Sequence, residues 1–552
     1  MNHTYLIAYL FVLYWLAISF LNKRGYLEKY NITAWGPVLM VRTTKGQKFL
    51  DVLAQPKKFW RAFANIGLPL MFVGMFVMVF IVAIADYAFI SQIQGDGLPE
   101  PGQFHQPRNI LLIPGVNDFI PLTWGLIGLV VTLIVHEFSH AILCKVEGIR
   151  VKSLGILLAP IPIGAFAEPD EEQLLGKSKD DKPIDKKIAT RNERVRILTA
   201  GVMANFVTAF FAFALFFIVL GAIEPSGNIL ITDVDENSIA IDAGIEPDMI
   251  ITQLNGVKIN SGSDFALGIS KADIDSTLSL QVIKDGTTKN ITMPVQKNDF
   301  DRAGLVIGEV VVDSAAQDAG IVEGTVLQQI DDTRVPSFGD FVGFMNNTQK
   351  GQVVLVKTFN RTSDNCEVVN ITLGAHPGKS DDNRGFLGVS QHTGGGIFFG
   401  GITISEFPAK EYLHALRSIP SMLNGLTGWF IIFTLPIFGF GGEGFPGFGD
   451  LLINFYEPAG WAQPLGIWTF WIANSALWIG WINFYVGLFN CLPAVPLDGG
   501  HVFKDTLSSV FNKILKNEKR SEQISHRIIT VLAVMIFSSF FLIIALPWIF
   551  QL

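Results

Sequence analysis

Long apolar runs constrain this chain more than any other feature of its sequence. Seven stretches approach about 20 mainly apolar residues, the length that an α-helix needs to cross the hydrocarbon core of a bilayer. They are residues 5–21, 66–90, 123–143, 197–220, 421–440, 467–489 and 527–549. Charged residues make up only 16% of the 552 residues and are segregated between these runs. A single soluble globule is therefore excluded, and the sequence predicts a polytopic α-helical membrane protein.

Lysine and arginine near the ends of the runs predict the orientation of the protein, because cytoplasmic loops carry an excess of both. Residues 22–65 and 144–196 are rich in them, whereas 91–122 contains a single arginine. The basic segment 491–526 also becomes cytoplasmic only if one run fails to cross. Of the seven, 421–440 is the weakest, because it contains glycines and a proline. We therefore expect about six spans, one interfacial or re-entrant helix, and both termini outside the cytoplasm.

The charge balance and the cysteines exclude further classes of protein. There are 41 Lys and Arg against 49 Asp and Glu, a net charge of −8, and no long basic tract. Nucleic acid is therefore not an expected partner. The three cysteines, Cys144, Cys366 and Cys491, lie too far apart for a CxxC zinc site or a disulfide framework.

The segment between the fourth and fifth runs contains an internal repeat. Residues 242–265 and 318–341 align without a gap at an offset of 76. Each copy reads as a hydrophobic strand, an Ala-Gly turn, an alternating strand, a second turn and a short helix that opens near Phe265 or Phe341. We expect both phenylalanines to be core residues rather than ligand contacts. The order of elements resembles PDZ domains, which bind an extended peptide by adding it as a strand.

This resemblance implies two α+β PDZ-like domains outside the cytoplasm, at 226–298 and 302–376, with an extended peptide or a free C-terminus as their partner. Two glycine-rich segments, 302–308 and 384–390, resemble the carboxylate-binding loop of such domains, but 384–390 lies after the second domain. The other expected divisions are an N-terminal span with a cytoplasmic segment (1–65), a membrane catalytic core (66–222), a linker with the interfacial helix (377–466) and a C-terminal membrane core (467–552).

The third apolar run contains His136, Glu137 and His140 within an otherwise apolar helix. Ionisable residues are costly inside a membrane and therefore indicate a functional site. A spacing of four puts the two imidazoles on one helical face about one turn apart. This suits two ligands to one Zn²⁺, with Glu137 beside them as general base. The alternative is that the histidines bond to neighbouring helices.

A catalytic zinc takes three protein ligands and keeps one position open for water, so a third ligand must come from elsewhere in the sequence. Asp498 is the candidate, in NCLPAVPLDGG directly after the 467–489 run. The histidines lie in the cytoplasmic third of their helix, and Asp498 reaches that side only if 421–440 does not cross. Charge bias and metal geometry thus require the same topology. Alternatively, Asp498 is an ordinary turn residue, since Asp-Gly is a common turn dipeptide.

HEFSH in one span and NCLPAVPLDGG after a later one, on either side of a PDZ-like pair, together resemble the site-2 protease family of intramembrane zinc metalloproteases. The resemblance covers most of residues 66 to 510. It implies one Zn²⁺ per molecule, with His136, His140 and Asp498 as its ligands and Glu137 as the catalytic base. HEFSH has serine where many members have glycine, a small-for-small change that should leave metal binding intact.

The resemblance also implies residues that bind the substrate. Gly201 and Asn205 match the GxxxN pattern of the family, which implies that Asn205 holds the substrate backbone or the oxyanion; a hydrogen bond between helices is the alternative. Asn490 matches the proline-broken loop of the family and is a second candidate for substrate binding. Residues 149–173 resemble the membrane-embedded β-hairpin of the family, which would pair with an unwound substrate helix. A loop buried against its neighbours is the alternative.

These features predict a protease of the cell membrane that hydrolyses a peptide bond in or near the transmembrane segment of a single-pass protein, in regulated intramembrane proteolysis. The active site would lie near the cytoplasmic side of the bilayer. One alternative is a catalytically silent PDZ scaffold or chaperone, which the presence of Glu137 and Asp498 disfavours. The other is a metal transporter, which would place further ligands at the same depth in other helices.

Overall fold

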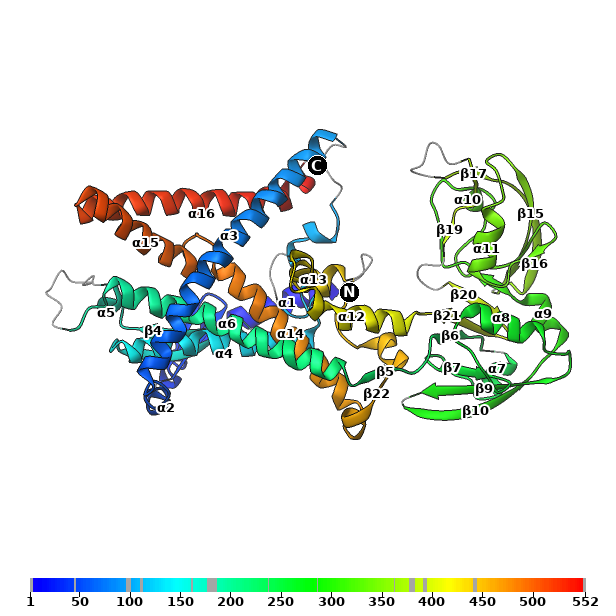
Figure 1. Ribbon diagram of the computed structural model, residues 1–552, viewed down its shortest axis with the longest axis horizontal. Coiled ribbons are helices and arrows are strands. Elements are labelled where there is room, and N and C mark those ends of the chain that lie inside the picture. The colour runs from blue at the N-terminus through cyan, green and yellow to red at the C-terminus, as the bar shows by residue number, and fades with distance from the viewer. Residues whose placement is uncertain are drawn as a thin grey trace. The chain divides into compact units, whose positions relative to one another are not determined.

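A computed structural model describes residues 3–43, 46–95, 101–109, 113–159, 162–175, 186–236, 238–284, 286–361, 363–376, 383–390, 395–439 and 444–549. The protein divides into two compact units. The first unit consists of Met1–Ile218, Gly425–Gly447 and Trp471–Leu552, and the second unit consists of Val219–Asn424 and Phe448–Phe470. Figure 1 labels the helices and strands of both.

Helices dominate the first unit. They are α1 (His3–Lys23), α2 (Gln47–Leu53), α3 (Lys57–Gly95), α4 (Leu122–Val146), α5 (Glu171–Leu175), α6 (Arg191–Leu220), α13 (Leu426–Phe438), α14 (Trp468–Asn490), α15 (Asp498–Leu515) and α16 (Glu518–Ile549). Five of these helices, α3, α4, α6, α14 and α16, are long and apolar enough to cross a membrane. The protein is therefore a polytopic membrane protein, as the apolar runs predict.

The two remaining apolar runs also form helices. The run at 421–440 contains α13, whose 13 residues rise only about 20 Å, less than the roughly 30 Å hydrocarbon core. A helix of this length is too short to cross by itself. The run at 5–21 coincides with α1, of which Tyr9–Lys23 is an apolar helix.

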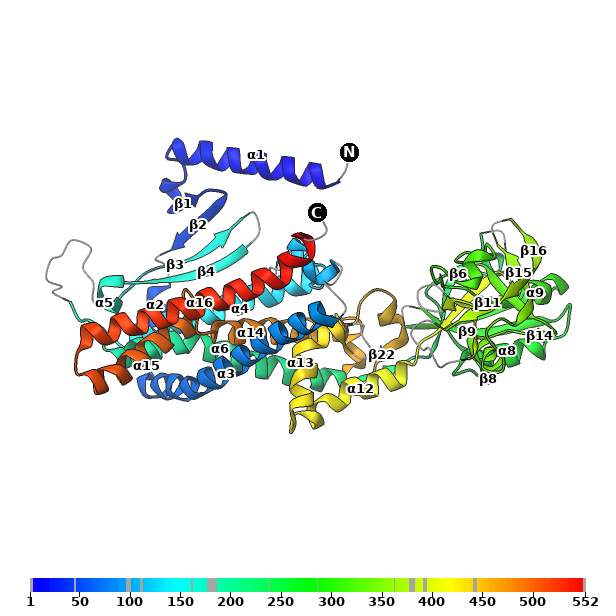
Figure 2. The ribbon, with the colours of Figure 1, turned by 90° about the horizontal axis from the view of Figure 1, so that it is seen from above.

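A four-stranded antiparallel sheet accompanies the helices of the first unit. Its strands are β1 (Ile32–Trp35), β2 (Val38–Thr43), β3 (Val151–Leu158) and β4 (Pro162–Pro169), and they pair in the order β1-β2-β3-β4. The expected hairpin at 149–173 is thus present as β3 and β4, with the turn residues 160–161 outside the described residues. The hairpin of β1 and β2 was not predicted. Figure 2 shows the sheet with β4 at one edge and α1 beyond β1.

The second unit contains one 12-stranded sheet. Its main path is β10-β9-β7-β6-β21-β20-β11-β13-β15-β16, and β8 and β14 pair with β7 and β13. The strands are β6 (Ile229–Val234), β7 (Ile250–Leu254), β8 (Val257–Lys258), β9 (Thr277–Lys284), β10 (Thr287–Pro294), β11 (Gly304–Val306), β13 (Val326–Ile330), β14 (Thr333–Arg334), β15 (Val353–Asn360), β16 (Asn365–Thr372), β20 (Gly396–Phe399) and β21 (Ile402–Glu406).

Shorter elements complete the second unit. Two-stranded pairs join β12 (Glu309–Val310) to β19 (Val389–Ser390), β17 (Gly374–Ala375) to β18 (Gly385–Phe386), and β22 (Tyr456–Pro458) to β5 (Ile223–Pro225). The helices are α7 (Ile239–Asp242), α8 (Gly262–Ser270), α9 (Lys297–Arg302), α10 (Ala315–Asp318), α11 (Phe338–Met345) and α12 (Ala409–Met422).

The sequence repeat reappears as a repeat of structure. The helices α7 and α8 and the strands β7, β8 and β9 each begin 76 residues before α10, α11, β13, β14 and β15. Ser261 and Ser337 cap the equivalent helices α8 and α11 by accepting a backbone N–H through their hydroxyl groups. Phe265 and Phe341 are 1% and 6% exposed and lie in the two hydrophobic cores. Their predicted role as core residues is confirmed.

A hairpin late in the sequence joins the two repeats into one sheet. Its strand β21 pairs with β6 of the first repeat, and its strand β20 pairs with β11 of the second. The segment 384–390 lies against the second repeat, where Gly388 accepts a hydrogen bond from Val311 N–H. Gly401 accepts the equivalent bond from Asp235 N–H in the first repeat. Residues 384–390 therefore complete the second repeat, and 396–406 join both repeats into one sheet, although the sequence places both segments in a linker.

Candidate metal centre

The helix α4 carries both histidines of the HEFSH motif on one face. The His136 and His140 Nε2 atoms are 3.1 Å apart, as expected for residues four apart on a helix. Asp498 is the first residue of α15, and its Oδ2 lies 3.2 Å from His136 Nε2 and 3.3 Å from His140 Nε2. The three residues named from the sequence as metal ligands thus converge on one point.

The size of this triangle fits zinc. In a tetrahedral site with metal–ligand distances of about 2.0–2.1 Å, two ligand atoms lie about 3.3–3.4 Å apart. The three donor atoms match that spacing, and their side chains are only 12–15% exposed. Asp498 Oδ2 is buried and accepts no hydrogen bond, which is costly for a carboxylate unless a cation balances it. Two imidazoles and one carboxylate also leave a fourth position open, as catalytic zinc sites do.

The other nitrogen of each imidazole has a partner on α6. His140 Nδ1 lies 2.7 Å from the carbonyl oxygen of Ile197, so Nδ1 carries the proton and donates it, which leaves the lone pair of Nε2 for a metal. His136 Nδ1 lies 3.1 Å from the Asn205 side-chain amide. Asn205 is fully buried, and its Oδ1 is otherwise without a partner.

The orientation of the Asn205 amide follows from the chemistry of His136. A metal on Nε2 requires a proton on Nδ1, and that N–H needs an acceptor. The nitrogen and oxygen of an amide are interchangeable by a half-turn. With Oδ1 toward His136, the imidazole donates to Asn205 and no buried oxygen is left unpaired. The geometry therefore connects Asn205 to His136 by a hydrogen bond between helices, which is the alternative that the sequence left open; that the partner would be a candidate metal ligand was not predicted.

Gly201 provides the space for the two imidazoles. A Cβ atom at this position of α6 would lie 2.5 Å from His140 Nε2 and 2.8 Å from His136 Cε1, closer than a carbon atom can approach. Gly201 and Asn205 are four residues apart and therefore face α4 from the same side of α6. The GxxxN pattern thus combines one residue that makes room for the histidines with one that bonds to His136.

Glu137 lies next to the histidines and contacts the sheet. Its Oε2 accepts a hydrogen bond of 2.8 Å from the backbone N–H of Ala167 in β4. The strand β4 packs along α4. The expected general base, which follows His136 in α4, is therefore bonded to the edge strand β4.

Ion pairs fix the helices that carry the ligands. Arg194 of α6 bonds Asp505 of α15 through Nε at 3.1 Å, and both side chains are largely buried. This pair ties the helix that begins with Asp498 to the helix that carries Asn205. At the end of α4, the fully buried carboxylate of Glu147 bonds Arg61 and Arg196 at 2.8 Å and 2.7 Å.

Asn490 is the one predicted site residue that these contacts do not include. It ends α14 and is partly buried. In the described part of the protein, no hydrogen bond or ion pair joins it to His136, His140 or Asp498.

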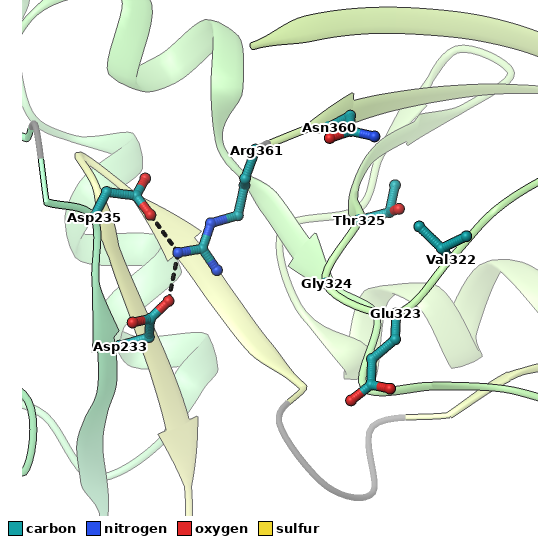
Figure 3. Close-up of a pocket in the computed structure, with 8 residues that line it drawn as sticks. All are labelled: Asp233, Asp235, Val322, Glu323, Gly324, Thr325, Asn360 and Arg361. Carbon is teal, nitrogen blue, oxygen red and sulfur yellow. Dashed lines mark hydrogen bonds and ion pairs between the residues drawn. The ribbon is translucent and has the colours of Figure 1, made fainter. Parts of the chain in front are cut away.

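The second unit contains a polar cavity of about 340 Å³ between its two repeats. It is lined by Asp233, Asp235, Val322, Glu323, Gly324, Thr325, Asn360 and Arg361 (Figure 3). Arg361 bonds Asp233 at 2.5 Å and also bonds Asp235, and its guanidinium lies 5.1 Å above the Phe398 ring. Asp233 and Asp235 lie at the end of β6 in the first repeat and Arg361 follows β15 in the second, so these bonds join the repeats. The two carboxylates raise the pKa of Arg361 despite its burial.

Two histidines and an aspartate that fit zinc, set among membrane-length apolar helices with a glutamate beside them, define a membrane metalloprotease. The chain belongs to peptidase family M50, whose pattern matches residues 124–412 and 451–536. The protein is therefore a zinc metalloprotease of the site-2 protease type and is embedded in a lipid bilayer. This membership favours an enzyme over a scaffold or a transporter.

The chain is also similar to individual proteins of bacteria and archaea. The regulator of sigma-E protease RseP of Salmonella typhimurium is 23% identical over 470 residues, which are 76% of this chain and 97% of that protein. An uncharacterized protein of Methanocaldococcus jannaschii is 27% identical over 283 residues, 51% of this chain and 68% of its own. A Clostridium acetobutylicum protein that bears a zinc metalloprotease name is 22% identical over 207 residues, 34% and 58% of the two proteins.

Proposed function

We propose that this enzyme hydrolyses peptide bonds in or near the transmembrane segments of single-pass membrane proteins, in regulated intramembrane proteolysis. The observation that carries the proposal is the position of Glu137, which lies beside the zinc ligands and at the same time touches the edge strand β4. A substrate strand on that edge would lie next to both the metal and the base.

In this proposal, His136, His140 and Asp498 hold one zinc ion. When bound, zinc supplies Lewis-acid chemistry, since it acidifies a water molecule and polarises the carbonyl group that is attacked. Glu137 takes the proton of the attacking water and passes it to the leaving amine. It follows His136 directly on α4, and the hydrogen bond from Ala167 N–H fixes the position of its carboxylate.

Two asparagines have supporting roles in the proposal. Asn205 holds His136 in the tautomer that leaves Nε2 free. This contact accounts for the burial of the Asn205 side chain better than direct binding of the oxyanion does. Asn490, at the end of α14 and before the loop that leads to Asp498, binds the substrate backbone. A polar group in this membrane-buried setting needs a partner, which an extended substrate can supply.

The sheet explains how a helical substrate can be cut. The amides of a transmembrane helix are bonded within the helix, and an unwound segment in lipid would leave them unpaired at a cost of several kcal/mol per group. The free edge of β4 offers replacement bonds by strand addition. The hairpin of β1 and β2 covers the outer edge of β3, so of the two strands beside α4 it is β4 that keeps an edge for a substrate, while β1 forms the far edge of the sheet.

The topology is part of the same proposal. Six helices, α1 with the five of membrane length, cross the bilayer, both termini lie outside the cytoplasm, and the metal centre lies near the cytoplasmic side. The insert is external and consists of two PDZ-like domains, of which the first comprises 226–298 with 396–406 and the second comprises 302–376 with 384–390. Their partner is an extended peptide or a C-terminus, and they act as a docking site or size filter.

Purified protein in detergent tests the proposal. Single-pass helices with short external stubs are incubated with the wild type, with Glu137→Gln, and with the wild type after zinc chelation. We expect cleavage by the untreated wild type alone, restored when Zn²⁺ is added back. Cleavage that persists in Glu137→Gln, or a zinc-loaded wild type that cuts soluble peptides but none of the helices, would contradict it.

A further inference from the structure

The carboxylate of Glu137 occupies a backbone donor that a substrate strand would need. Its Oε2 lies 2.8 Å from Ala167 N. The strand β4 is the last strand of its sheet, and in the described part of the protein no strand pairs with its outer side. The N–H of Ala167 therefore points to the free edge rather than toward β3.

Strand geometry makes the two uses of this N–H mutually exclusive. A strand that adds to an edge lies about 4.8 Å away, and its carbonyl oxygen lies about 2.9 Å from the N–H that it accepts. Glu137 Oε2 already lies at that distance from Ala167 N. Residues two apart on a strand turn their N–H groups to the same edge, so Ala165 offers a second donor there. The carboxylate of Glu137 bonds Ala167 rather than this neighbour.

We propose that addition of a substrate strand to β4 releases Glu137 for catalysis. Without substrate, Ala167 N–H donates to Oε2 and holds the carboxylate against β4. When a substrate carbonyl takes this N–H, the carboxylate loses the charge-assisted hydrogen bond that holds it against β4 and is free to turn to the attacking water. The base is thus active only when an unwound segment lies on the edge, which protects intact helices and water-exposed polypeptides. This inference rests on the proposed function, because it takes β4 as the substrate edge.

Competition for the amide gives a test that needs no turnover. A fluorescently labelled single-pass helix is titrated into zinc-loaded Glu137→Gln, whose amide oxygen still accepts from Ala167, and into Glu137→Ala, which has no acceptor. We expect Glu137→Ala to bind the helix roughly three- to tenfold more tightly, because a competing hydrogen bond is removed. Equal affinities of the two variants would overturn the proposal.

Proline at the edge isolates the amide itself. Ala167→Pro removes the N–H, and proline is tolerated on an edge strand where the N–H is not part of the ladder. The matched control is Ala165→Pro. In the Ala167→Pro background, we expect Glu137→Ala and Glu137→Gln to bind the helix equally, whereas in the Ala165→Pro background their difference should persist. A difference that survives in both backgrounds would show that Glu137 acts on binding by another route.

Turnover of a blocked dipeptide completes the test, because such a probe is too short to add as a strand. We expect Ala167→Pro to cleave it roughly tenfold faster than the wild type, and Ala165→Pro to match the wild type. If Ala167→Pro cleaves the dipeptide more slowly than both the wild type and Ala165→Pro, the Ala167 amide positions Glu137 for catalysis. That result would overturn the proposal that a substrate strand releases Glu137. Failure of the wild type to cut any single-pass helix would instead count against the proposed function.

Discussion

At the scale of single residues, the metal centre depends on groups that bind no metal themselves. Each imidazole of the proposed zinc site is fixed through its second nitrogen by a group of α6, Ile197 O for His140 and the Asn205 amide for His136. These partners decide which nitrogen carries the proton, and hence whether Nε2 can bind a metal. If the proton of either histidine moved from Nδ1 to Nε2, that histidine could no longer bind a metal through Nε2, although the backbone would be unchanged.

The role of Asn205 can be separated from a role at the oxyanion. We expect Asn205→Ala to weaken zinc binding roughly 10- to 100-fold, the usual effect of losing a partner of a metal-bound histidine. Competition with a zinc-sensitive dye measures this affinity. Asn205→Asp, which keeps an acceptor for His136 Nδ1, serves as the matched control and should retain most of the affinity. If Asn205→Ala binds zinc like the wild type but turns over substrate more slowly, the contact with His136 is not its function.

Gly201 allows a second test at this scale. A methyl group at Gly201 would meet both imidazoles below 3 Å, so Gly201→Ala must displace at least one ligand. We expect a purified variant with less than about a tenth of the zinc of the wild type, since second-sphere changes alone already cost 10- to 100-fold. Gly343→Ala is the control, because nothing lies within 4 Å of a Cβ there. Full metal occupancy in Gly201→Ala, measured by elemental analysis, would contradict this account of the site.

At the scale of elements, the helices α3 and α6 are joined to α4 at the end of α4, close to the histidines of the candidate zinc site. Glu147, directly after α4, bonds Arg61 of α3 and Arg196 of α6, and Lys187 donates to its carbonyl oxygen. Burial alone would raise the pKa of Glu147, but the hydrogen bonds and charges of the two arginines outweigh it, so the pKa lies below its ordinary value. The carboxylate is therefore ionised in the folded protein and holds the three helices together.

This arrangement predicts a pH-dependent stability. Because the folded-state pKa of Glu147 is lowered, its contribution is complete above the unfolded pKa of about 4.3 and is lost as the pH falls through the lower folded value. We expect Glu147→Gln to destabilise the protein by about 3 kcal/mol at pH 7, with a gap to the wild type that narrows below about pH 4. Thermal unfolding in detergent across pH measures the gap. A gap that is constant with pH would exclude the charge of Glu147 as the cause.

Elements also show which parts of the site a sequence can reveal. Local helix geometry predicts that His136 and His140 share one face. The distribution of lysine and arginine predicts that Asp498 lies on the same side of the membrane as the histidines, so both features could be predicted from the sequence. The contact between Ala167 and Glu137 could not be predicted, because it depends on how a strand packs against a helix some 30 residues away. The hairpin of β1 and β2 has a visible signal, the alternating ITAWGPVLMVRT around a Gly-Pro turn, but its pairing with β3 spans more than 100 residues.

At the scale of the whole molecule, the insert is organised differently from the order of its sequence. The second repeat lies in the sequence between the first repeat and the strand β21 that completes the first. The glycines Gly401 and Gly388 fill equivalent places, with positive φ and no room for a Cβ beside Ser238 and Ser314. Similarity of 242–265 to 318–341 reveals two copies, but not that both are closed by residues after them, since strand pairing between distant segments leaves little local trace.

This order of the strands predicts which fragment of the insert folds as an independent unit. A soluble fragment of residues 226–406 contains both repeats with β20 and β21, whereas a fragment of 226–376 lacks both strands and exposes β6 and β11 as unpaired edges. Exposed edges promote association between molecules, and the lost strands bury Ile397, Phe399 and Ile402 in the core of the first repeat. We expect the longer fragment to unfold as one cooperative, monomeric unit. The shorter one should aggregate or melt at least about 5 °C lower, roughly the effect of losing 2 kcal/mol in a unit of 150–250 residues. Circular dichroism with light scattering distinguishes these outcomes, and equal melting of two monomeric fragments would mean that 396–406 is a linker after all.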